Sequence, residues 1–137
     1  ALRLGIDTVT VTRALAPVAP RVAVGGLPVL LREGAIDPQV DSAGNAGFRG
    51  VNPRTAIAVA DAGRRLLLVT VDGRQPGRSV GISLRDLAAL LQSLGARDAI
   101  NLDGGGSTTM VANGRVVNKP SDAAGQRPVG DAILVLP

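Results

Sequence analysis

Apolar residues fall mostly into short runs rich in Val, Ile and Leu that alternate with turn signals, a pattern typical of strands. The clearest case is a hairpin predicted from residues 55–60 and 65–71, which flank the turn residues 61–64. Asn113 and Gly114 predict a second tight turn. The remaining strands are expected at residues 9–12, 22–24, 28–34, 98–102, 110–112, 115–118 and 132–136.

One segment has the periodicity of an amphipathic helix instead. Residues 84–94 place leucines at helical spacing, with Ser83 as a candidate N-cap, Asp86 in the first turn and Gly95 as the left-handed stop. Residues 37–52 are polar and rich in glycine, which predicts a long loop. The chain is therefore expected to have an α+β fold, a mostly antiparallel sheet covered by one main helix. The leucines expected on the buried face are Leu84, Leu87, Leu91 and Leu94, with Leu90 beside them.

Composition narrows the class of protein. The 137 residues predict one domain, and 45% hydrophobic against 19% charged residues excludes a disordered tail. Phe48 is the single aromatic residue, so the core must consist of small branched side chains. No run approaches the roughly 20 apolar residues that span a bilayer, and no membrane span is expected.

Charge and missing residue types exclude several functions. The formal net charge is +4, and fourteen of the fifteen basic residues are scattered arginines without aromatic stacking partners, so nucleic-acid binding is not expected. The absence of Cys and His removes thiol catalysis, Cys or His zinc sites and any Ser-His-Asp triad. Carboxylate, hydroxyl, amide and guanidinium groups remain available for chemistry.

Residues 101–110, Asn-Leu-Asp-Gly-Gly-Gly-Ser-Thr-Thr-Met, are the strongest candidate for a site. An apolar run delivers the Asp103 carboxylate into three glycines. These glycines lose much backbone entropy on ordering, which favours either close approach of a ligand to bare backbone or positive φ angles. A flexible turn between two strands is the alternative. The backbone of residues 104–107 could form an anion nest, but it lacks the lysine of a Walker loop.

This segment, together with others in order along the chain, resembles the phosphodiester glycosidase family. The other segments are Asn52-Pro53-Arg54-Thr55-Ala56-Ile57, Asp72-Gly73-Arg74, Ser79-Val80-Gly81, the predicted helix, Asn118-Lys119-Pro120-Ser121 and Gln126-Arg127-Pro128-Val129-Gly130-Asp131-Ala132. Ala58 departs from the family, which typically has glycine there. The family domain also begins earlier, with an Asn-Gly-Gly-Phe-Phe-like segment. Residues 1–137 are accordingly expected to be a phosphodiester glycosidase-like domain that lacks this N-terminal segment.

The resemblance implies hydrolysis of the glycosidic bond of a sugar-1-phosphodiester, with release of free sugar and a phosphomonoester. Asp103 is the first candidate for the catalytic carboxylate. Glycoside hydrolysis usually needs a second one, for which Asp72 and Asp122 are the candidates, although Asp72 also fits a plain β-turn. Glu33, the one glutamate, fits a hairpin turn beside Gly34.

Substrate binding is assigned to side chains that suit phosphate and sugar. Arg54, Arg74 and Arg127 are candidate clamps for phosphate or sugar, or structural arginines. Gly104, Gly105 and Gly106 complete the candidate binding set with four residues that can hydrogen-bond sugar hydroxyls: Asn101, Ser107, Thr108 and Asn118. Thr108 equally fits an ordinary strand position, and Asn118 an ordinary turn.

Other properties stay open at this point. A non-catalytic carbohydrate- or phosphate-binding module in cell-wall or exopolysaccharide metabolism is the alternative function, although the lack of Trp and Tyr argues against it. No cofactor is firmly implied; calcium or magnesium could use oxygen ligands from Asp103, Asn101 and Asp122. Edge strands favour pairing into a homo-oligomer, and a separate N-terminal fragment could complete the site. The resemblance implies a secreted or periplasmic location.

Overall fold

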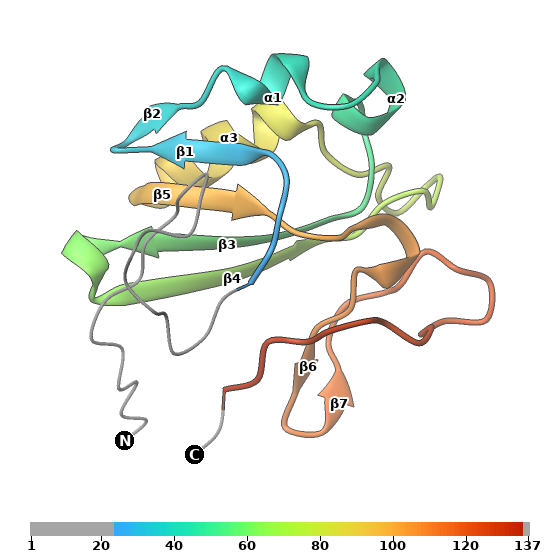
Figure 1. The fold of residues 1–137 in the computed structure, drawn as a ribbon. Helices are drawn as coiled ribbons and strands as arrows, with labels where there is room; N and C mark the ends of the chain where they lie inside the picture. Colours follow the sequence, from blue (N-terminus) through green and yellow to red (C-terminus); the bar gives the residue numbers. More distant parts are fainter. Residues whose placement is uncertain (1–23, 136–137) are drawn as a thin grey trace.

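The computed structural model describes residues 24–135, and these form an antiparallel sheet covered by helices (Figure 1). The sheet has the strand order β2-β1-β5-β3-β4, and each neighbouring pair is antiparallel. A separate ribbon pairs two further strands. The strands are β1 (Val29–Arg32), β2 (Ala35–Ile36), β3 (Arg54–Ala60), β4 (Arg65–Val71), β5 (Ala96–Asn101), β6 (Val111–Ala112) and β7 (Arg115–Val116). The expected α+β fold is confirmed.

The β3–β4 hairpin forms as its sequence predicts. The pairing runs without a register shift from Arg54 opposite Val71 to Ala60 opposite Arg65. A short 3-10 turn, η1 (Asp61–Gly63), connects the strands, and its residues have positive φ angles that let the chain reverse. This hairpin fixes the positions of Arg54 at one end of β3 and Asp72 just beyond β4.

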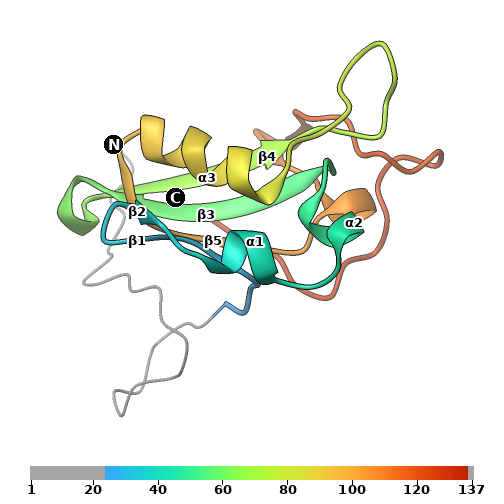
Figure 2. The same cartoon turned by 90° about the horizontal axis from the view of Figure 1, so that it is seen from above.

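Helix α3 (Leu84–Ser93) packs along one face of the sheet, as Figure 2 shows from above. The Ser83 hydroxyl caps it by accepting a hydrogen bond from the Asp86 N–H at 3.1 Å, as the sequence predicts. The small side chains of Ala58 and Ala99 lie buried in the sheet core, where they leave room for helical leucines to approach. The buried helix residues are Leu84, Leu87, Ala88 and Leu91.

The leucine stripe is shorter than expected. Leu94 is 47% exposed because the helix ends at Ser93, and Leu94 is its C-cap just before Gly95 turns the chain at a φ of +82°. Leu90 is also exposed, at 38%. The prediction for Leu94 was wrong, since the helix ends before it, whereas Leu90 lies within α3 beside the buried residues of the helix.

Several predicted elements differ in the structure. Residues 37–52 contain two short helices, α1 (Gln39–Ser42) and α2 (Ala46–Arg49), where a loop was expected. The expected strand at 28–34 is only β1, because Glu33 and Gly34 form the predicted tight turn into β2. Residues 132–135 are not a strand, and residue 136 lies outside the described residues. The strands expected at 9–12 and 22–24 lie outside them as well, except Val24, which is not in a strand.

The segment beyond β5 leaves the sheet at the end where β3 begins. A short 3-10 turn, η2 (Gly105–Ser107), follows the strand and leads into the β6–β7 ribbon, seen beyond the sheet in Figure 1. The ribbon forms around Asn113 and Gly114 as predicted, but β7 stops at Val116, two residues before Asn118. The glycine motif therefore lies where three strands end or begin.

Candidate functional site

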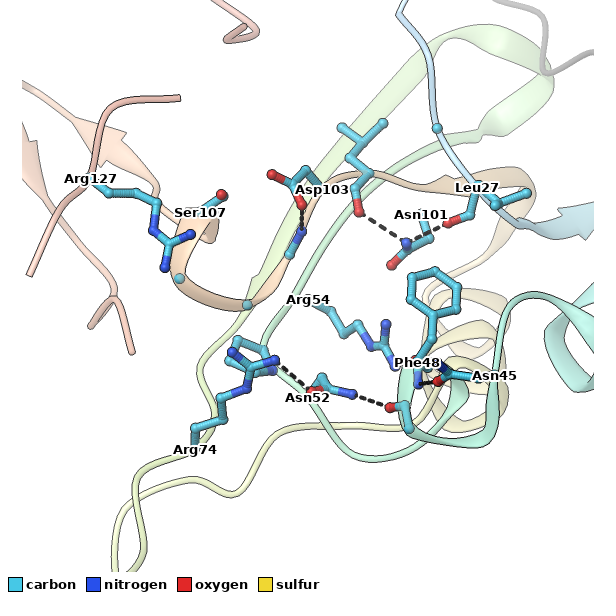
Figure 3. Close-up of a pocket in the computed structure, with 17 residues that line it drawn as sticks. Leu27, Asn45, Phe48, Asn52, Arg54, Arg74, Asn101, Asp103, Ser107 and Arg127 are labelled. Atoms are coloured by element: carbon cyan, nitrogen blue, oxygen red, sulfur yellow. Dashed lines mark hydrogen bonds between the residues drawn. The ribbon is translucent and has the colours of Figure 1, made fainter. Parts of the chain in front are cut away.

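A cavity of about 710 Å³ lies at this end of the sheet, between the glycine motif and helix α2 (Figure 3). It brings together most of the residues that the sequence predicts for a site. The predicted residues that line it are Arg54, Arg74, Asn101, Asp103, Gly104, Gly105, Gly106, Ser107 and Arg127.

Arg54 is the deepest cation of the cavity, with only 3% of its surface exposed. Its Nη2 donates to the carbonyl oxygens of Phe48 and Gly50, both at 2.6 Å, and its Nε donates to the Ile82 oxygen at 3.2 Å. No carboxylate of the described residues pairs with it. Burial, and to a lesser extent the charge of Arg74, lowers the pKa of Arg54 below the ordinary value of an arginine. Carbonyl oxygens accept the hydrogen bonds of Arg54, but no counter-ion within residues 24–135 balances its charge, and a buried charge in this state favours the arrival of an anion.

Arg74 approaches the cavity from the loop after β4. Its backbone has a φ of 56°, and its Nη2 donates to the Asn52 side-chain oxygen at 2.9 Å. The Asn52 amide nitrogen in turn donates to the Gly47 oxygen at 2.8 Å, so that Arg74 is linked to helix α2. Within the described chain Arg74 has no acidic partner. It therefore adds a second cation that is free to bind a negative group.

Arg127 is the third arginine at the cavity, and it differs from the other two because it forms an ion pair with Asp122. The Arg127 Nε donates to the Asp122 Oδ2 at 2.5 Å. Asp122 does not line the cavity. Since its carboxylate already holds a guanidinium, the geometry favours a positioning role for Asp122 over the catalytic role that the sequence suggested.

Each glycine of the motif lies close to other protein atoms, but the constraint differs between the three positions. A Cβ at Gly104 would lie 2.7 Å from the backbone oxygen of Pro53, which cannot yield. Gly105 has a φ of +61° and lies against the guanidinium of Arg74. A Cβ at Gly106 would overlap the ends of Arg127 and Asp122. The expected positive φ angle is found at Gly105, and the groups that approach the backbone of Gly104 and Gly106 belong to the protein itself.

The expected anion nest is not formed. The N–H groups of Gly104, Gly105 and Ser107 donate to the Asp103 Oδ1 at 2.8 Å, the Pro53 oxygen at 3.0 Å and the Gly104 oxygen at 3.1 Å. Only the Gly106 N–H lacks a hydrogen bond to the described part of the protein. This prediction was wrong because the 3-10 turn uses the N–H groups internally. An anion in the cavity must be bound mainly by side chains.

Asp103 lies immediately beyond β5, and its side chain is exposed at the cavity rim. Its Oδ1 accepts the hydrogen bond from the Gly104 N–H, which fixes the carboxylate, while Oδ2 has no partner among residues 24–135. It is the one carboxylate among the described residues that line the cavity. The position fits the role of reacting group that the sequence suggested.

Asp72 lies at the end of β4 but does not line the cavity. Its carboxylate accepts hydrogen bonds from the Asn118 side-chain nitrogen at 3.0 Å and from the Lys119 N–H at 2.9 Å, and Arg78 lies 3.6 Å away. Asn118 also accepts from the Met110 N–H at 2.7 Å. These contacts tie the segment after β7 to the sheet. They favour the turn role considered for Asp72 over a catalytic one.

Two of the predicted sugar-binding residues are likewise turned away from the cavity. Asn118 is used by Asp72 and Met110, as above, and Thr108 is 1% exposed with its hydroxyl 3.4 Å from that of Thr55. Their positions fit structural roles. Sequence analysis did not assign eight further lining residues to the site. Signals existed for some of them, since Asn52, Pro53 and Leu102 stand in the quoted motifs and Phe48 is the lone aromatic residue. The eight are Gly26, Leu27, Asn45, Gly47, Phe48, Asn52, Pro53 and Leu102.

The oxygen groups considered for calcium or magnesium do not converge. Asp122 is engaged by Arg127, and Figure 3 shows Arg127 and Asn101 on opposite sides of Asp103. Backbone carbonyls hold the Asn101 amide nitrogen. In the described part of the chain no three acidic or His and Cys side chains cluster. We therefore derive no step through a metal. None of the described helices is long and apolar enough to cross a bilayer.

Comparison with known proteins identifies the family of this chain. The phosphodiester glycosidase family model matches residues 5–136. Bovine (Bos taurus) N-acetylglucosamine-1-phosphodiester alpha-N-acetylglucosaminidase is 43% identical over 72 residues, which are 53% of this chain but only 13% of the bovine protein. The chain thus spans a small part of the curated relatives that it matches.

Solved structures give the same result. A Burkholderia pseudomallei protein whose name describes it as exported is 54% identical, with a TM-score of 0.61 over 64% of this chain and 16% of its own. The catalytic domain of the zebrafish N-acetylglucosamine-1-phosphodiester alpha-N-acetylglucosaminidase, auto-inhibited by its pro-peptide, is 31% identical, with a TM-score of 0.62 over 78% of this chain and 37% of its own. Together with the family match over nearly the whole sequence, these likenesses show that the chain belongs to the phosphodiester glycosidase family.

Proposed function

We propose that this protein hydrolyses the glycosidic bond of a sugar-1-phosphodiester and releases free sugar and a phosphomonoester. The observation that carries the proposal is that one cavity combines the carboxylate of Asp103 with Arg54, a buried arginine that has no carboxylate partner among residues 24–135. A phosphodiester bound to a sugar supplies an anion for the arginine. Its anomeric carbon is the electrophile that a carboxylate, or a water that it activates, can attack.

The chemistry of the leaving group explains why one carboxylate can suffice. A phosphate monoester departs as a stable anion, so it needs little proton donation and much electrostatic stabilisation. Arg54 and Arg74 supply positive charge without described acidic partners, and Arg127 adds a guanidinium held by Asp122. Guanidinium N–H groups donate charge-assisted hydrogen bonds to phosphate oxygens. In Arg54 the Nη1 group is the one left for this role, because Nε and Nη2 donate to the carbonyls of Ile82, Phe48 and Gly50.

Asp103 is assigned the attack at the anomeric centre. It attacks either directly, displacing the phosphomonoester and forming a glycosyl ester that water then hydrolyses, or as the base that takes a proton from the attacking water. Its Oδ1 is held by the Gly104 N–H, and its Oδ2 remains available. Replacing Asp103 by Asn keeps an oxygen that can accept from Gly104 but removes the charge that attack requires. Turnover should therefore fall by at least about 100-fold, as expected for loss of a general base.

The test compares the parent chain with Asp103→Asn on a panel of α-sugar-1-phosphodiesters that includes UDP-N-acetylglucosamine. Free sugar is followed by mass spectrometry, and circular dichroism checks that both proteins fold. Release by the parent alone supports the proposal. Equal release by a folded Asp103→Asn protein would remove Asp103 from the mechanism, and no release by a folded parent would contradict hydrolysis by this chain.

A non-catalytic carbohydrate- or phosphate-binding module is the second candidate. Its support is that Asp103 stands alone as a carboxylate among the described cavity residues, whereas glycoside hydrolysis usually uses two. Calorimetry of UDP-N-acetylglucosamine with the same two proteins distinguishes the candidates, because a binding module takes up the ligand without releasing sugar.

We also propose export from the cytoplasm. The support is the Burkholderia relative, whose name describes it as exported.

A further inference from the structure

Asn101 has a buried hydrogen-bond acceptor that nothing in the described protein satisfies. The residue ends β5, lines the cavity and is 2% exposed. Its Nδ2 donates to the Leu27 oxygen at 2.7 Å and to the Leu102 oxygen at 2.9 Å, as Figure 3 shows. Its Oδ1 is buried and has no hydrogen-bond partner among the described residues. Leaving such a group without a donor is unfavourable, so a bound ligand that supplies one is favoured.

The orientation of this amide is determined by its neighbours. Carbonyl oxygens only accept hydrogen bonds, so the nitrogen of Asn101 must face the two carbonyls and the oxygen must face the other way. The unsatisfied atom therefore requires a donor, a hydroxyl or an amide N–H. A phosphate oxygen cannot satisfy it, because a phosphodiester oxygen carries no hydrogen.

The position of Asn101 in the sheet relates it to the anion-binding arginine. Asn101 is the cross-strand partner of Ala56, and Arg54 lies two residues before Ala56 on the same face of β3. Such diagonal neighbours lie about 7 Å apart. In Figure 3 the amide oxygen points to the side of the cavity where Arg54 lies. A ligand whose phosphate contacts Arg54 would thus place its adjacent atoms beside Asn101.

We propose that the Oδ1 of Asn101 accepts a hydrogen bond from the substituent at C2 of the sugar and so determines specificity. This inference rests on the proposed function. On a glycosyl phosphate, C1 has two ring neighbours, the ring oxygen and C2. The ring oxygen has no hydrogen, so the nearest donor to the phosphate is the C2 hydroxyl, or the N–H of an acetamido group there. Either one provides the donor that Asn101 lacks.

The first test varies the ligand and leaves the fold unchanged. Calorimetry with Asp103→Asn, which is expected to bind without turnover, measures the affinities for UDP-glucose and its 2-deoxy and 6-deoxy analogues. Loss of the C2 hydroxyl should weaken binding by about tenfold or more, because the acceptor is then left unsatisfied, whereas loss of the C6 hydroxyl should change it little. Equal losses, a loss confined to C6, or no binding of UDP-glucose by folded protein would overturn the proposal.

The second test asks whether Asn101 itself is responsible. In a protein that also carries Asn101→Leu, the difference between UDP-glucose and the 2-deoxy analogue should disappear. Gln75→Leu is the matched control: Gln75 also donates its amide nitrogen to a carbonyl and also has a buried oxygen without a described partner, but it does not line the cavity. With Gln75→Leu the difference should persist.

The outcomes separate the two proposals. A difference that survives in a folded Asn101→Leu protein would assign the C2 contact to another residue and overturn the inference. If Asn101→Leu does not fold, the ligand series decides alone, because it needs no change at Asn101. If the parent binds with the expected dependence on C2 but releases no sugar, hydrolysis fails and the assignment of Asn101 stands.

Discussion

Phe48 holds the guanidinium of Arg54 in two ways. Its ring lies under the guanidinium, 5.5 Å from the Arg54 Cζ to the ring centroid, and its backbone oxygen accepts a hydrogen bond from Nη2 at 2.6 Å. Gly44 allows this arrangement, since a Cβ there would lie 2.8 Å from the ring. The one aromatic side chain of the sequence is thus used to position the deepest cation of the cavity.

Replacing Phe48 with leucine should therefore lower the affinity for ligand and cause only a modest loss of folding stability. Leucine keeps apolar volume but lacks the ring quadrupole, so the free energy of unfolding should fall by about 1 kcal/mol, the size of a partly buried cation–π contact. Urea titration measures this change, and calorimetry with UDP-N-acetylglucosamine measures the accompanying loss of affinity. Phe48→Tyr retains a ring and should behave like the parent. Equal effects of the two substitutions would contradict the role of the ring.

Gly104→Ala should lower the folding stability, whereas Gly106→Ala should lower the activity. The Cβ at residue 104 meets the fixed backbone oxygen of Pro53, so the free energy of unfolding should fall by about 2 kcal/mol, as in other overpacked sites. The Cβ at residue 106 meets only the ends of the Arg127 and Asp122 side chains, which can move away.

For Gly106→Ala we therefore expect little loss of stability but reduced sugar release, because Arg127 is displaced from the cavity. Thermal unfolding and the release assay on the same samples separate the two effects. Gly130→Ala is the control, since its added Cβ meets nothing within 4 Å. A Gly106→Ala protein with parental activity would show that the position of Arg127 is unimportant.

Asp72→Asn should lower the folding stability, whereas Asp103→Asn should leave the folding stability nearly unchanged and abolish turnover. The Asp72 Oδ1 accepts from Asn118 and Lys119, and Oδ2 faces the Lys119 N–H at 3.1 Å and the Arg78 guanidinium at 3.6 Å. An amide NH2 in place of Oδ2 would set a donor against these donors and remove the charge, so Asp72→Asn should lower the free energy of unfolding by about 1–3 kcal/mol. Asp103→Asn should leave it within about 0.5 kcal/mol, as is usual for exposed positions. Urea titration of both proteins provides the measurement. Parental stability with complete loss of turnover in Asp72→Asn would instead support a catalytic Asp72.

The ion pair between Asp41 of α1 and Arg85 of α3 should make stability depend on acid pH. The hydrogen bond from Arg85 holds the pKa of Asp41 below its ordinary value of 3.8. Because the pKa is depressed in the folded state, the stabilising contribution is present above the unfolded pKa and is lost as the pH falls through the folded one. Asp41→Asn should remove this part of the pH dependence.

The measurement is the urea midpoint followed from neutral pH to below the folded pKa of Asp41. Arg85→Gln removes the same hydrogen bond from the other side and should flatten the profile equally. If the profile of Asp41→Asn runs parallel to that of the parent over the whole range, this pair does not contribute to acid stability.

Local sequence predicts the elements whose residues carry their own signals. The Ser83 cap and Gly95 stop define α3, and the β-branched runs around residues 61–64 define the β3–β4 hairpin. The short helices α1 and α2 were missed because each has four residues, too few for helical periodicity to register. Leu94 was misplaced because a periodic stripe does not reveal where the last turn of a helix separates from the sheet.

For the site, the residue types already limit the chemistry that is available: one motif joins Asp103 to three glycines, several arginines are present, and His and Cys are absent. The use of these groups depends on the folded chain. Within the part that the structure describes, Arg54 is buried without an acidic partner, Asp72 and Asp122 form other contacts, and the Asn101 oxygen has no hydrogen-bond donor. The physical reason is that charge compensation and hydrogen-bond satisfaction depend on segments distant in sequence, whereas residue pattern reports mainly on neighbours along the chain.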